Sequence, residues 1–552
     1  MMANTFSVEA TPLAAPLDSV LSVRGLSVQL PKNMERTFAV ENISFDLMKG
    51  EILCIIGESG SGKSVTANTI MGLLPHTIRA TAGSILMGGS DLLKLPEREL
   101  LSLRGRMVSM IFQDPLSALN PLMRIGDQIA EVMEVHAVGT ASSRRAKVLE
   151  LLDEVGLPNP KVLQHQYPFR LSGGQRQRVM IAMALALDPD ILIADEPTTA
   201  LDVTTQAQIL ELIRRIQQRK NMSVMFITHD FGVVAEIADR VLVMEKGSLV
   251  EQGDVKEVLE QPTHPYTRKL IAAVPRMSQS DREGSTDADV VLKIEHLNKT
   301  YQTSAGIFKP QRTVRAVDDV NVTLFEGRTL GIVGESGSGK STLGKIIVKL
   351  MESDSGRIVF RGTDIAKMSD RDFRAQRPFI QMIFQDPFAS LNPRHTVFTA
   401  LTAGPLGHGG MSVSAAREKA EHLLELVGLD AKSLSRYPHE FSGGQRQRIG
   451  IARALMFDPQ VLVADEAVSA LDVSIQAQIL ELLTRIQKEM KIAMIFITHD
   501  LRVASKICDE IIVMHRGRIV EQGSPFSIFR QPSHEYTQRL VASIPGADWA
   551  VS

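Results

Sequence analysis

Cysteine is scarce in this chain, whose 552 residues include only two, Cys54 and Cys508. Because they are far apart in the sequence, we expect two reduced core thiols and neither a disulfide framework nor an iron–sulfur cluster. No apolar run approaches the ~18 residues that a membrane-spanning helix requires. The net charge of −2 leaves no positive excess for binding nucleic acid. With 44% hydrophobic and 22% charged residues, the composition is typical of globular α/β domains.

Two segments have the composition of connectors and not of a core. Residues 1–20 lack a basic segment followed by an apolar stretch, which predicts a flexible tail and not a signal peptide. Residues 276–290 are rich in Ser, Asp, Glu and Gly, and we interpret them as a linker. The chain is therefore predicted to contain two domains, residues 21–275 and 291–552.

One octapeptide occurs twice. Gly-Glu-Ser-Gly-Ser-Gly-Lys-Ser fills residues 57–64 and recurs letter for letter at 334–341. Each copy follows an apolar run that predicts a buried strand, and precedes a segment with helical character. In such a loop the glycines let main-chain N–H groups turn toward a phosphate, the lysine reaches the phosphate oxygens, and the last serine ligates Mg²⁺. The predicted nucleotide contacts are Gly57, Ser59, Gly60, Ser61, Gly62, Lys63 and Ser64, with Gly334, Ser336, Gly337, Ser338, Gly339, Lys340 and Ser341.

The rest of the chain repeats with these loops. Lys63 and Lys340 lie 277 residues apart, whereas Ser172 and Ser442 lie 270 apart, so the offset changes by a few residues between them. A period of this length is far too long for a solenoid repeat. Each copy should therefore be a domain with its own core.

In each half an apolar strand ends in two carboxylates, Asp195-Glu196 and Asp465-Glu466. Side chains alternate along a strand, so the two adjacent acids point in different directions and can serve different purposes. We expect the aspartates to orient the Mg²⁺ shell and the glutamates to polarise an attacking water.

Another apolar strand ends in a histidine 34 residues after each aspartate, at His229 and His499. Such a histidine can hydrogen-bond a γ-phosphate and hold the glutamate and the water in line. An isolated histidine would more often be structural, but this one is placed identically in both halves. The predicted catalytic residues are Glu196, His229, Glu466 and His499.

A Ser-Gly-Gly-Gln segment precedes a further predicted helix in each half, at residues 172–175 and 442–445. It gives each domain a second anion-binding helix N-terminus, although one triphosphate does not need two in one domain. Here the chain resembles the ATP-binding subunits of ABC transporters, whose signature motif is the Leu-Ser-Gly-Gly-Gln that begins at Leu171. The resemblance covers about residues 21–275 and 291–545.

The resemblance implies a fold and a set of cofactors. The fold is α/β, with two tandem P-loop NTPase domains of the ABC ATPase type, each with a helical subdomain (about 114–178 and 386–448) and a short C-terminal extension. The implied cofactors are ATP and Mg²⁺. The signature residues expected to contact nucleotide are Ser172, Gly173, Gly174, Gln175, Ser442, Gly443, Gly444 and Gln445.

In that family two nucleotide domains meet head to tail. The loop at 57–64 would then face residues 442–445, and the loop at 334–341 would face residues 172–175. ATP bound between the two domains would hold them together, and hydrolysis would be coupled to their opening and closing.

Gln113 and Gln385 each stand in an Ile-Phe-Gln-Asp-Pro string. In the family this glutamine touches Mg²⁺ and the nucleophilic water and starts the helical subdomain; in isolation the string would predict only a polar turn. The implied Mg²⁺ site residues are Ser64, Gln113, Asp195, Ser341, Gln385 and Asp465.

Two further strings in each half resemble the dipeptide, oligopeptide and nickel importers within the family. They are residues 114–121 and 386–393, and the terminal segments 262–267 and 532–537, whose His and Tyr side chains we expect to pack a C-terminal helix. Fusion of two such halves is similar to glutathione import ATPases and to fused oligopeptide or microcin importer ATPases. The implied function is ATP-driven peptide uptake through two separate permease subunits served by a periplasmic or extracellular solute-binding protein. The chain would lie at the cytoplasmic face of the bacterial inner membrane. No nucleic acid is expected among its partners.

Some positions depart from the family pattern. Ala467 stands where the first half has Pro197, which allows a looser turn after the glutamate. Aligning residues 21–30 with 292–301 places Leu30 opposite Tyr301, the position at which these ATPases stack an aromatic ring on adenine. Tyr301 is therefore an expected adenine contact.

Two other classes of protein are alternatives. A soluble twin ATPase of the translation-factor type also fuses two such domains, but typically has a long charged helical linker and an Asn-His pair after the acidic strand end. A scaffold clamped by nucleotide would not hydrolyse it; intact Glu196, Glu466, His229 and His499 argue against that class, and an ATPase assay discriminates.

Overall fold

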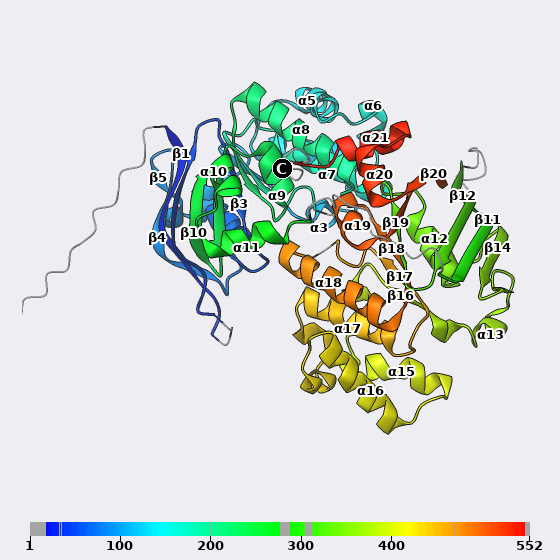
Figure 1. Cartoon of the computed structure of the whole chain (residues 1–552). Coiled ribbons are helices and arrows are strands. Elements are labelled where there is room, and N and C mark those ends of the chain that lie inside the picture. The colour runs from blue at the N-terminus through cyan, green and yellow to red at the C-terminus, as the bar shows by residue number, and fades with distance from the viewer. Residues whose placement is uncertain are drawn as a thin grey trace, which may run out of the picture. The chain divides into compact units, whose positions relative to one another are not determined.

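The computed structural model describes residues 18–32, 34, 36–199, 201–275, 288–303, 312–469 and 471–546 (Figure 1). Residues 1–17 of the predicted tail and 276–287 of the predicted linker lie outside the described residues. The chain divides into two compact units, Met1–Leu201 with Thr205–Ala272, and Asp202–Thr204 with Ala273–Ser552. The first strand begins at Ser19, two residues before the predicted domain start, and the exact domain boundaries remain predictions.

The strands of the first half form two sheets. A four-stranded antiparallel sheet has the order β2-β1-β4-β5, and a six-stranded sheet has the order β10-β9-β3-β8-β7-β6, parallel except where β10 pairs with β9. The strands are β1 (Ser19–Gln29), β2 (Phe38–Met48), β3 (Ile52–Ile56), β4 (Arg79–Met87), β5 (Ser90–Asp91), β6 (Val108–Ile111), β7 (Ile191–Asp195), β8 (Ser223–Ile227), β9 (Arg240–Glu245) and β10 (Ser248–Asp254).

The helices of the first half follow the strands in the alternation expected for parallel pairing. They are α1 (Lys63–Ile70), α2 (Glu97–Leu103), α3 (Pro115–Ala118), α4 (Ile125–Val135), α5 (Ala141–Glu154), α6 (Pro160–Leu163), α7 (Gly173–Ala184), α8 (Val203–Lys220), α9 (Phe231–Ile237), α10 (Val255–Glu260) and α11 (Pro265–Ala273), with short 3₁₀ turns η1 (Leu92–Lys94) and η2 (Pro168–Arg170).

The second half repeats both sheets. Their orders are β12-β11-β14-β15 and β16-β17-β18-β13-β19-β20. The strands are β11 (Val290–Thr303), β12 (Arg312–Phe325), β13 (Thr329–Val333), β14 (Ser355–Phe360), β15 (Thr363–Asp364), β16 (Ile380–Ile383), β17 (Val461–Asp465), β18 (Ala493–Thr498), β19 (Glu510–His515) and β20 (Arg518–Gly523).

The helices of the second half occupy corresponding places. They are α12 (Lys340–Ile347), α13 (Asp370–Phe373), α14 (Pro387–Ser390), α15 (Val397–His408), α16 (Val413–Leu426), α17 (Gly443–Leu455), α18 (Val473–Met490), α19 (Leu501–Ile507), α20 (Pro525–Arg530) and α21 (Glu535–Ala542), with 3₁₀ turns η3 (Arg377–Phe379), η4 (Ala431–Ser435) and η5 (Pro438–Glu440). The predicted α/β fold class is thereby confirmed in both halves.

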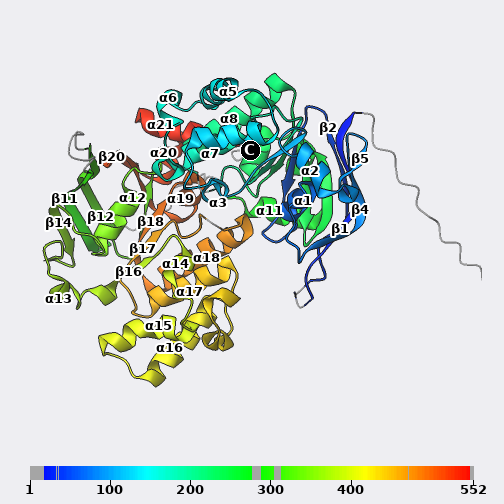
Figure 2. The ribbon, with the colours of Figure 1, turned by 180° about the vertical axis from the view of Figure 1, so that it is seen from behind.

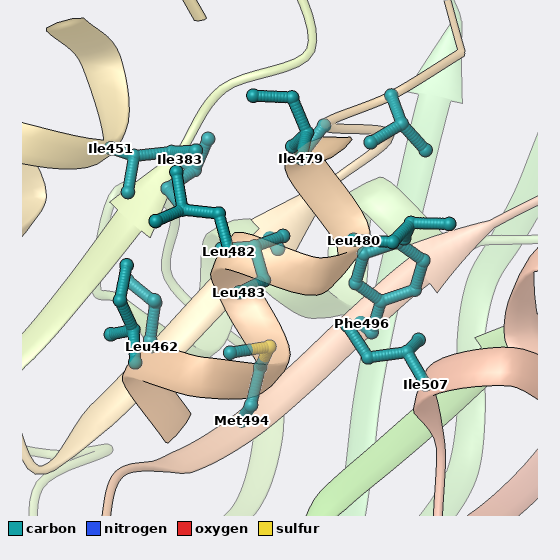
Figure 3. Close-up of a cluster of buried hydrophobic side chains, with 14 of the residues drawn as sticks. Ile383, Ile451, Leu462, Ile479, Leu480, Leu482, Leu483, Met494, Phe496 and Ile507 are labelled. Carbon is teal, nitrogen blue, oxygen red and sulfur yellow. The ribbon is translucent and has the colours of Figure 1, made fainter. Parts of the chain in front are cut away.

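The central strands are apolar throughout because both faces of the parallel sheet are covered. In β17, Val461 and Val463 pack into the cluster that includes α12 and the antiparallel sheet, whereas Leu462 and Ala464 pack into the cluster on the opposite face. That opposite face is covered by α17, α18 and α19. Figure 3 shows part of it, with side chains of α18 lying over those of β17 and β18. Full burial of a valine or leucine side chain contributes roughly 1.5–3 kcal/mol to stability. The buried strands are therefore held firmly in place, and so are the polar residues at their ends.

Each half also has a helical subdomain. In the first half α4, α5 and α7 pack on one another, and in the second half α15, α16 and α17 do the same. Figure 1 and Figure 2 show the second set from both sides. The helices that begin at the signature segments, α7 and α17, continue beyond residues 178 and 448 at which the subdomains were predicted to end.

Candidate nucleotide sites

Each phosphate-binding loop connects the end of a buried strand to the start of a helix. Residues 57–64 link β3 to α1, and residues 334–341 link β13 to α12. Gly57 has φ of 154°, and a Cβ there would lie 2.2 Å from the main-chain oxygen of Met244. Its counterpart Gly334 has φ of 150°, and a Cβ there would lie 2.2 Å from the main-chain oxygen of Met514. The first position of each loop therefore excludes any side chain.

The loop lysines fold back onto the loops that carry them. Nζ of Lys63 donates to the main-chain oxygens of Gly57, at 2.7 Å, and Glu58, at 3.0 Å. Nζ of Lys340 donates to the main-chain oxygens of Gly334 and Glu335, both at a distance of 2.8 Å. Burial lowers the pKa of Lys340, while the nearby carboxylate of Glu466 opposes that shift. Each ammonium is thus positioned inside the concavity of its loop.

The serine that ends each loop meets the aspartate that ends the neighbouring strand. Oγ of Ser64 donates to Oδ1 of Asp195 over 3.1 Å, and Oγ of Ser341 donates to Oδ1 of Asp465 over 2.9 Å. Burial, with the charge of the adjacent Glu196, raises the pKa of Asp195 to about 6, and burial also raises the pKa of Asp465. Hydroxyl and carboxylate oxygens are the donors that Mg²⁺ prefers, so this pair fits the implied metal.

The glutamates follow these aspartates in a left-handed backbone conformation. Glu196 has φ of 46° and Glu466 has φ of 47°, values that are costly for a residue with a side chain. The main-chain N–H of Glu196 donates to the oxygen of Ile227 over 2.9 Å, which anchors the turn on β8. The two φ angles agree although Ala467 stands where the first half has Pro197.

Three side chains converge on the carboxylate of Glu196. Nε2 of Gln113 donates to its Oε2 over 3.0 Å, and Oγ1 of Thr199 donates to the same oxygen over 2.9 Å. Nδ1 of His229 lies 3.3 Å from Oε1. Burial acts to raise the pKa of Glu196, but the hydrogen bond and charge of His229, the hydrogen bond of Thr199 and the charge of Lys63 outweigh it and lower the pKa to about 2. The carboxylate is therefore ionised and fixed in direction.

The second half builds the same arrangement around Glu466. Nε2 of Gln385 donates to its Oε2 over 2.7 Å, and Nδ1 of His499 lies 3.5 Å from its Oε1. The pKa of Glu466 is also lowered, since the interactions with His499 outweigh burial. Within each half, the structure therefore brings together the loop, the acid pair, the glutamine and the histidine that the sequence predicted.

The signature segments cap helices. Oγ of Ser172 accepts from the N–H of Gln175, whose Oε1 in turn accepts from the N–H of Ser172, and Ser442 and Gln445 do the same at α17. These reciprocal bonds form a capping box that holds the first turn of the helix. Facing of each signature to the other half's loop remains a prediction.

The two predicted adenine positions differ. Tyr301 lies in β11 with 39% of its surface exposed, and its hydroxyl lies 2.8 Å from the sulfur of Met351. Leu30 follows β1 and is half-buried; its N–H donates to the oxygen of Thr37 over 2.9 Å. Phe38 starts β2 opposite Gln29, one residue from Leu30.

The structure gives a hydrogen-bonding role to two kinds of residue for which the sequence analysis predicts none. Thr199, which binds the Glu196 carboxylate, was given no role. Tyr266 and Tyr536 were expected only to pack a helix, yet their hydroxyl oxygens accept hydrogen bonds from the main-chain N–H groups of Glu58 and Glu335. The repetition of these tyrosines in both halves was the available signal.

With this geometry established, comparisons with known proteins define the class. The family description "ABC transporter" matches residues 40–199 and 317–469, and "Oligopeptide/dipeptide transporter, C-terminal region" matches residues 250–303 and 520–550. This chain belongs to the ABC transporter family. The predicted pair of tandem ABC ATPase domains is confirmed.

Several relatives are similar over nearly the whole chain. The glutathione import ATP-binding protein GsiA of Salmonella choleraesuis (strain SC-B67) is 44% identical, with 97% of this chain and 92% of the relative covered. The peptidoglycan transport ATP-binding protein YejF of Agrobacterium fabrum (strain C58 / ATCC 33970) is 47% identical, with 95% and 96% covered. Among solved structures, a dimeric ATP-binding cassette bound to ADP and Pi is 28% identical, covers 42% of this chain and 98% of its own, and has a TM-score of 0.39.

Other features of the described part of the chain bear on the remaining expectations. No helix there combines the length and hydropathy needed to cross a membrane. No group of three or more His, Cys, Asp and Glu side chains there could hold a metal ion. Cys54 and Cys508 are both buried in the core. Burial raises the pKa of the Cys54 thiol, which favours its protonated form.

Proposed function

We propose that this chain is the ATP-hydrolysing subunit of an importer that carries peptides, namely dipeptides, oligopeptides or glutathione-like molecules. Membership of the ABC transporter family supports this proposal, as does the matching oligopeptide/dipeptide transporter C-terminal region in both halves. The relatives named for glutathione import and peptidoglycan transport support a peptide or peptide-containing cargo.

The observation that carries the proposal is the oriented carboxylate of Glu196, with its counterpart Glu466. Each is ionised, is held by a glutamine amide and has a histidine at 3.3 or 3.5 Å. A carboxylate fixed in this way can accept a proton from a water placed beside it, and the histidine can hold water and phosphate in line.

The other residues then have defined roles. The lysines Lys63 and Lys340 balance phosphate charge, and the loop glycines expose N–H groups to the phosphates. Mg²⁺, which supplies charge neutralisation between the phosphates, would be held by Ser64, Gln113 and Asp195 in one half and by Ser341, Gln385 and Asp465 in the other. Tyr301 would contact adenine.

We further propose two composite sites. One combines the loop at 57–64 with Ser442–Gln445, and the other combines the loop at 334–341 with Ser172–Gln175. The capping boxes of α7 and α17 support this role, because they fix the first turn of each helix, whose N-terminus carries a partial positive charge that favours an anion.

The partners follow from the transport function. The chain would act at the cytoplasmic face of the bacterial inner membrane, bound to two integral-membrane permease subunits, with a solute-binding protein delivering cargo from outside. The absence of a membrane-crossing helix among the described residues is consistent with such a division of labour.

Reconstitution tests this function. The full chain would be purified with the membrane proteins that accompany it, placed in vesicles, and assayed for uptake of labelled dipeptides, oligopeptides and glutathione with the matching solute-binding protein. We expect uptake that requires ATP and is lost in a Glu196→Gln, Glu466→Gln double variant. ATP hydrolysis without uptake of any peptide would refute the peptide importer.

A further inference from the structure

Each C-terminal extension reaches the phosphate loop of its own half through one tyrosine. Tyr266 in α11 is 8% exposed, and its hydroxyl oxygen accepts from the N–H of Glu58 over 3.1 Å. Tyr536 in α21 is 4% exposed and accepts from the N–H of Glu335 over 3.0 Å. The same contact therefore occurs in both halves.

The residue held by the tyrosine also holds the loop lysine. The main-chain oxygen of Glu58 accepts from Nζ of Lys63 over 3.0 Å, while its N–H donates to the tyrosine. In the second half the oxygen of Glu335 accepts from Nζ of Lys340 over 2.8 Å. One loop residue therefore connects the extension on one side to the phosphate-binding ammonium on the other.

The tyrosine is itself fixed within the extension. In the first half, the N–H of Tyr266 donates to Nδ1 of His264 over 3.3 Å, and the N–H of His264 donates to the carboxylate of Glu251 over 3.2 Å. The N–H of Thr263 donates to the same carboxylate over 2.6 Å. The carboxylate of Glu251 thereby anchors the segment that begins α11, and with it the ring of Tyr266.

The second half repeats these bonds with different lengths. The N–H of Tyr536 donates to Nδ1 of His534 over 3.1 Å, and the N–H groups of Ser533 and His534 donate to the carboxylate of Glu521 over 2.7 and 3.1 Å. The repeated terminal strings of the sequence thus encode a hydrogen-bonded chain and not only an apolar packing surface.

The hydroxyl stays protonated at neutral pH. Burial raises the pKa of Tyr536 to about 12, and burial raises the pKa of Tyr266 as well. The Tyr536 ring is further held by stacking on His515, with ring centroids 4.0 Å apart. In the first half the residue that corresponds to His515 is Glu245, the last residue of β9, which has no ring to stack on Tyr266.

We propose that Tyr266 and Tyr536 are positioning residues for ATP binding: by fixing the peptide groups of Glu58 and Glu335, they hold each loop lysine ready for phosphate. Loss of the hydroxyl frees the first turn of the loop, so binding ATP must then order it. The extension becomes a part of the nucleotide site, and a displacement of α11 or α21 would be transmitted to the lysine. This inference rests on the proposed ATP sites.

The test uses Tyr→Phe variants of the full chain, since phenylalanine keeps the buried ring and removes only the hydroxyl. Tyr266→Phe would be made with Lys340→Ala, so that the loop at 57–64 dominates binding, and Tyr536→Phe with Lys63→Ala. Tyr167→Phe and Tyr437→Phe, which remove a hydroxyl elsewhere in the same half, are the matched controls. The dissociation constant of a fluorescent ATP analogue, KM and kcat for ATP, and the melting temperature without nucleotide would be measured.

We expect the dissociation constant and KM to rise about 3- to 10-fold in Tyr266→Phe and Tyr536→Phe, with kcat at saturating ATP within about 2-fold of the parent. The controls should bind as their parents do. An unchanged dissociation constant, whatever the melting temperature does, overturns the inference. Absence of ATP binding in the parent variants would overturn the proposed function as well.

Discussion

Oγ1 of Thr199 donates a hydrogen bond to Oε2 of Glu196 over 2.9 Å, three residues along the chain. At the same place in the second half, Oγ of Ser469 donates over 3.1 Å to the main-chain oxygen of Glu466. The shortest hydrogen bonds of the two hydroxyl groups therefore differ in their acceptor, although Ser469 also lowers the pKa of Glu466 through a side-chain hydrogen bond and the φ angles of the two glutamates agree.

This difference predicts an unequal response to removal of the hydroxyl. Thr199→Val keeps the shape of the side chain but removes a hydrogen bond to a charged group, worth about 1.5–3 kcal/mol. We expect kcat at the first site to fall roughly 10-fold, with little change in KM. Ser469→Ala is the matched control and should have a smaller effect. Equal losses in single-site backgrounds would contradict a special role for Thr199.

Replacing either glutamate should remove hydrolysis at its own site. Glu196→Gln and Glu466→Gln each delete the water-polarising base, and we expect a loss on the order of 10²–10⁴-fold at that site, measured as phosphate release. ATP binding should persist in both variants. If one variant keeps full turnover and full transport, that site is not required and the symmetric arrangement is wrong.

Asp195 should make the metal-free protein less stable as the pH rises. Its pKa is about 6 in the folded chain, above the ordinary value of 3.8 that it has in the unfolded chain, so the unfolded chain loses its proton first. Stability from this group is therefore present at low pH and is lost as the pH rises from about 4 to about 6, by ~1–3 kcal/mol. In chelator, Asp195→Asn should melt above the parent at about pH 7.5, and the difference should shrink toward about pH 5. A difference independent of pH would reject this assignment.

The purified chain should be colourless and bind no structural metal. Its two cysteines lie in strand β3 and after helix α19, and no Cys/His pattern has the spacing of a structural site. Absorption spectra and elemental analysis check this. A visible iron–sulfur band, or zinc in stoichiometric amount, would contradict it.

The two sites should differ in affinity for ATP. Aromatic stacking on a base contributes about 1–3 kcal/mol, which Tyr301 can provide and Leu30 cannot. We expect binding roughly 5- to 100-fold weaker at the Lys63 site, unless Phe38 substitutes. Lys63→Ala and Lys340→Ala variants would be titrated separately with a fluorescent ATP analogue. Equal affinities would reject the asymmetry, as would a Leu30→Tyr change that does not tighten the Lys63 site.

The sequence by itself determined which residues carry the proposed chemistry and in what local order they stand. The spacing of glycines, lysine and serine after an apolar run is a local pattern, and a loop between strand and helix follows from residues adjacent in the chain. The duplication of every motif showed two domains of one kind, and the apolar runs that end at Asp195 and Asp465 became fully buried parallel strands.

Only the tertiary structure decided which distant groups meet. β3 lies between β8 and β9 in its sheet, which brings the loop after Ile56 beside the segments that follow Ile227 and Glu245. The contact of Tyr266 with Glu58 spans 208 residues of sequence. Such contacts depend on strand order and on the burial of whole helix faces, which are cooperative properties of the core, so the apolar pattern around a tyrosine predicts that it is buried but not which N–H group its hydroxyl will reach.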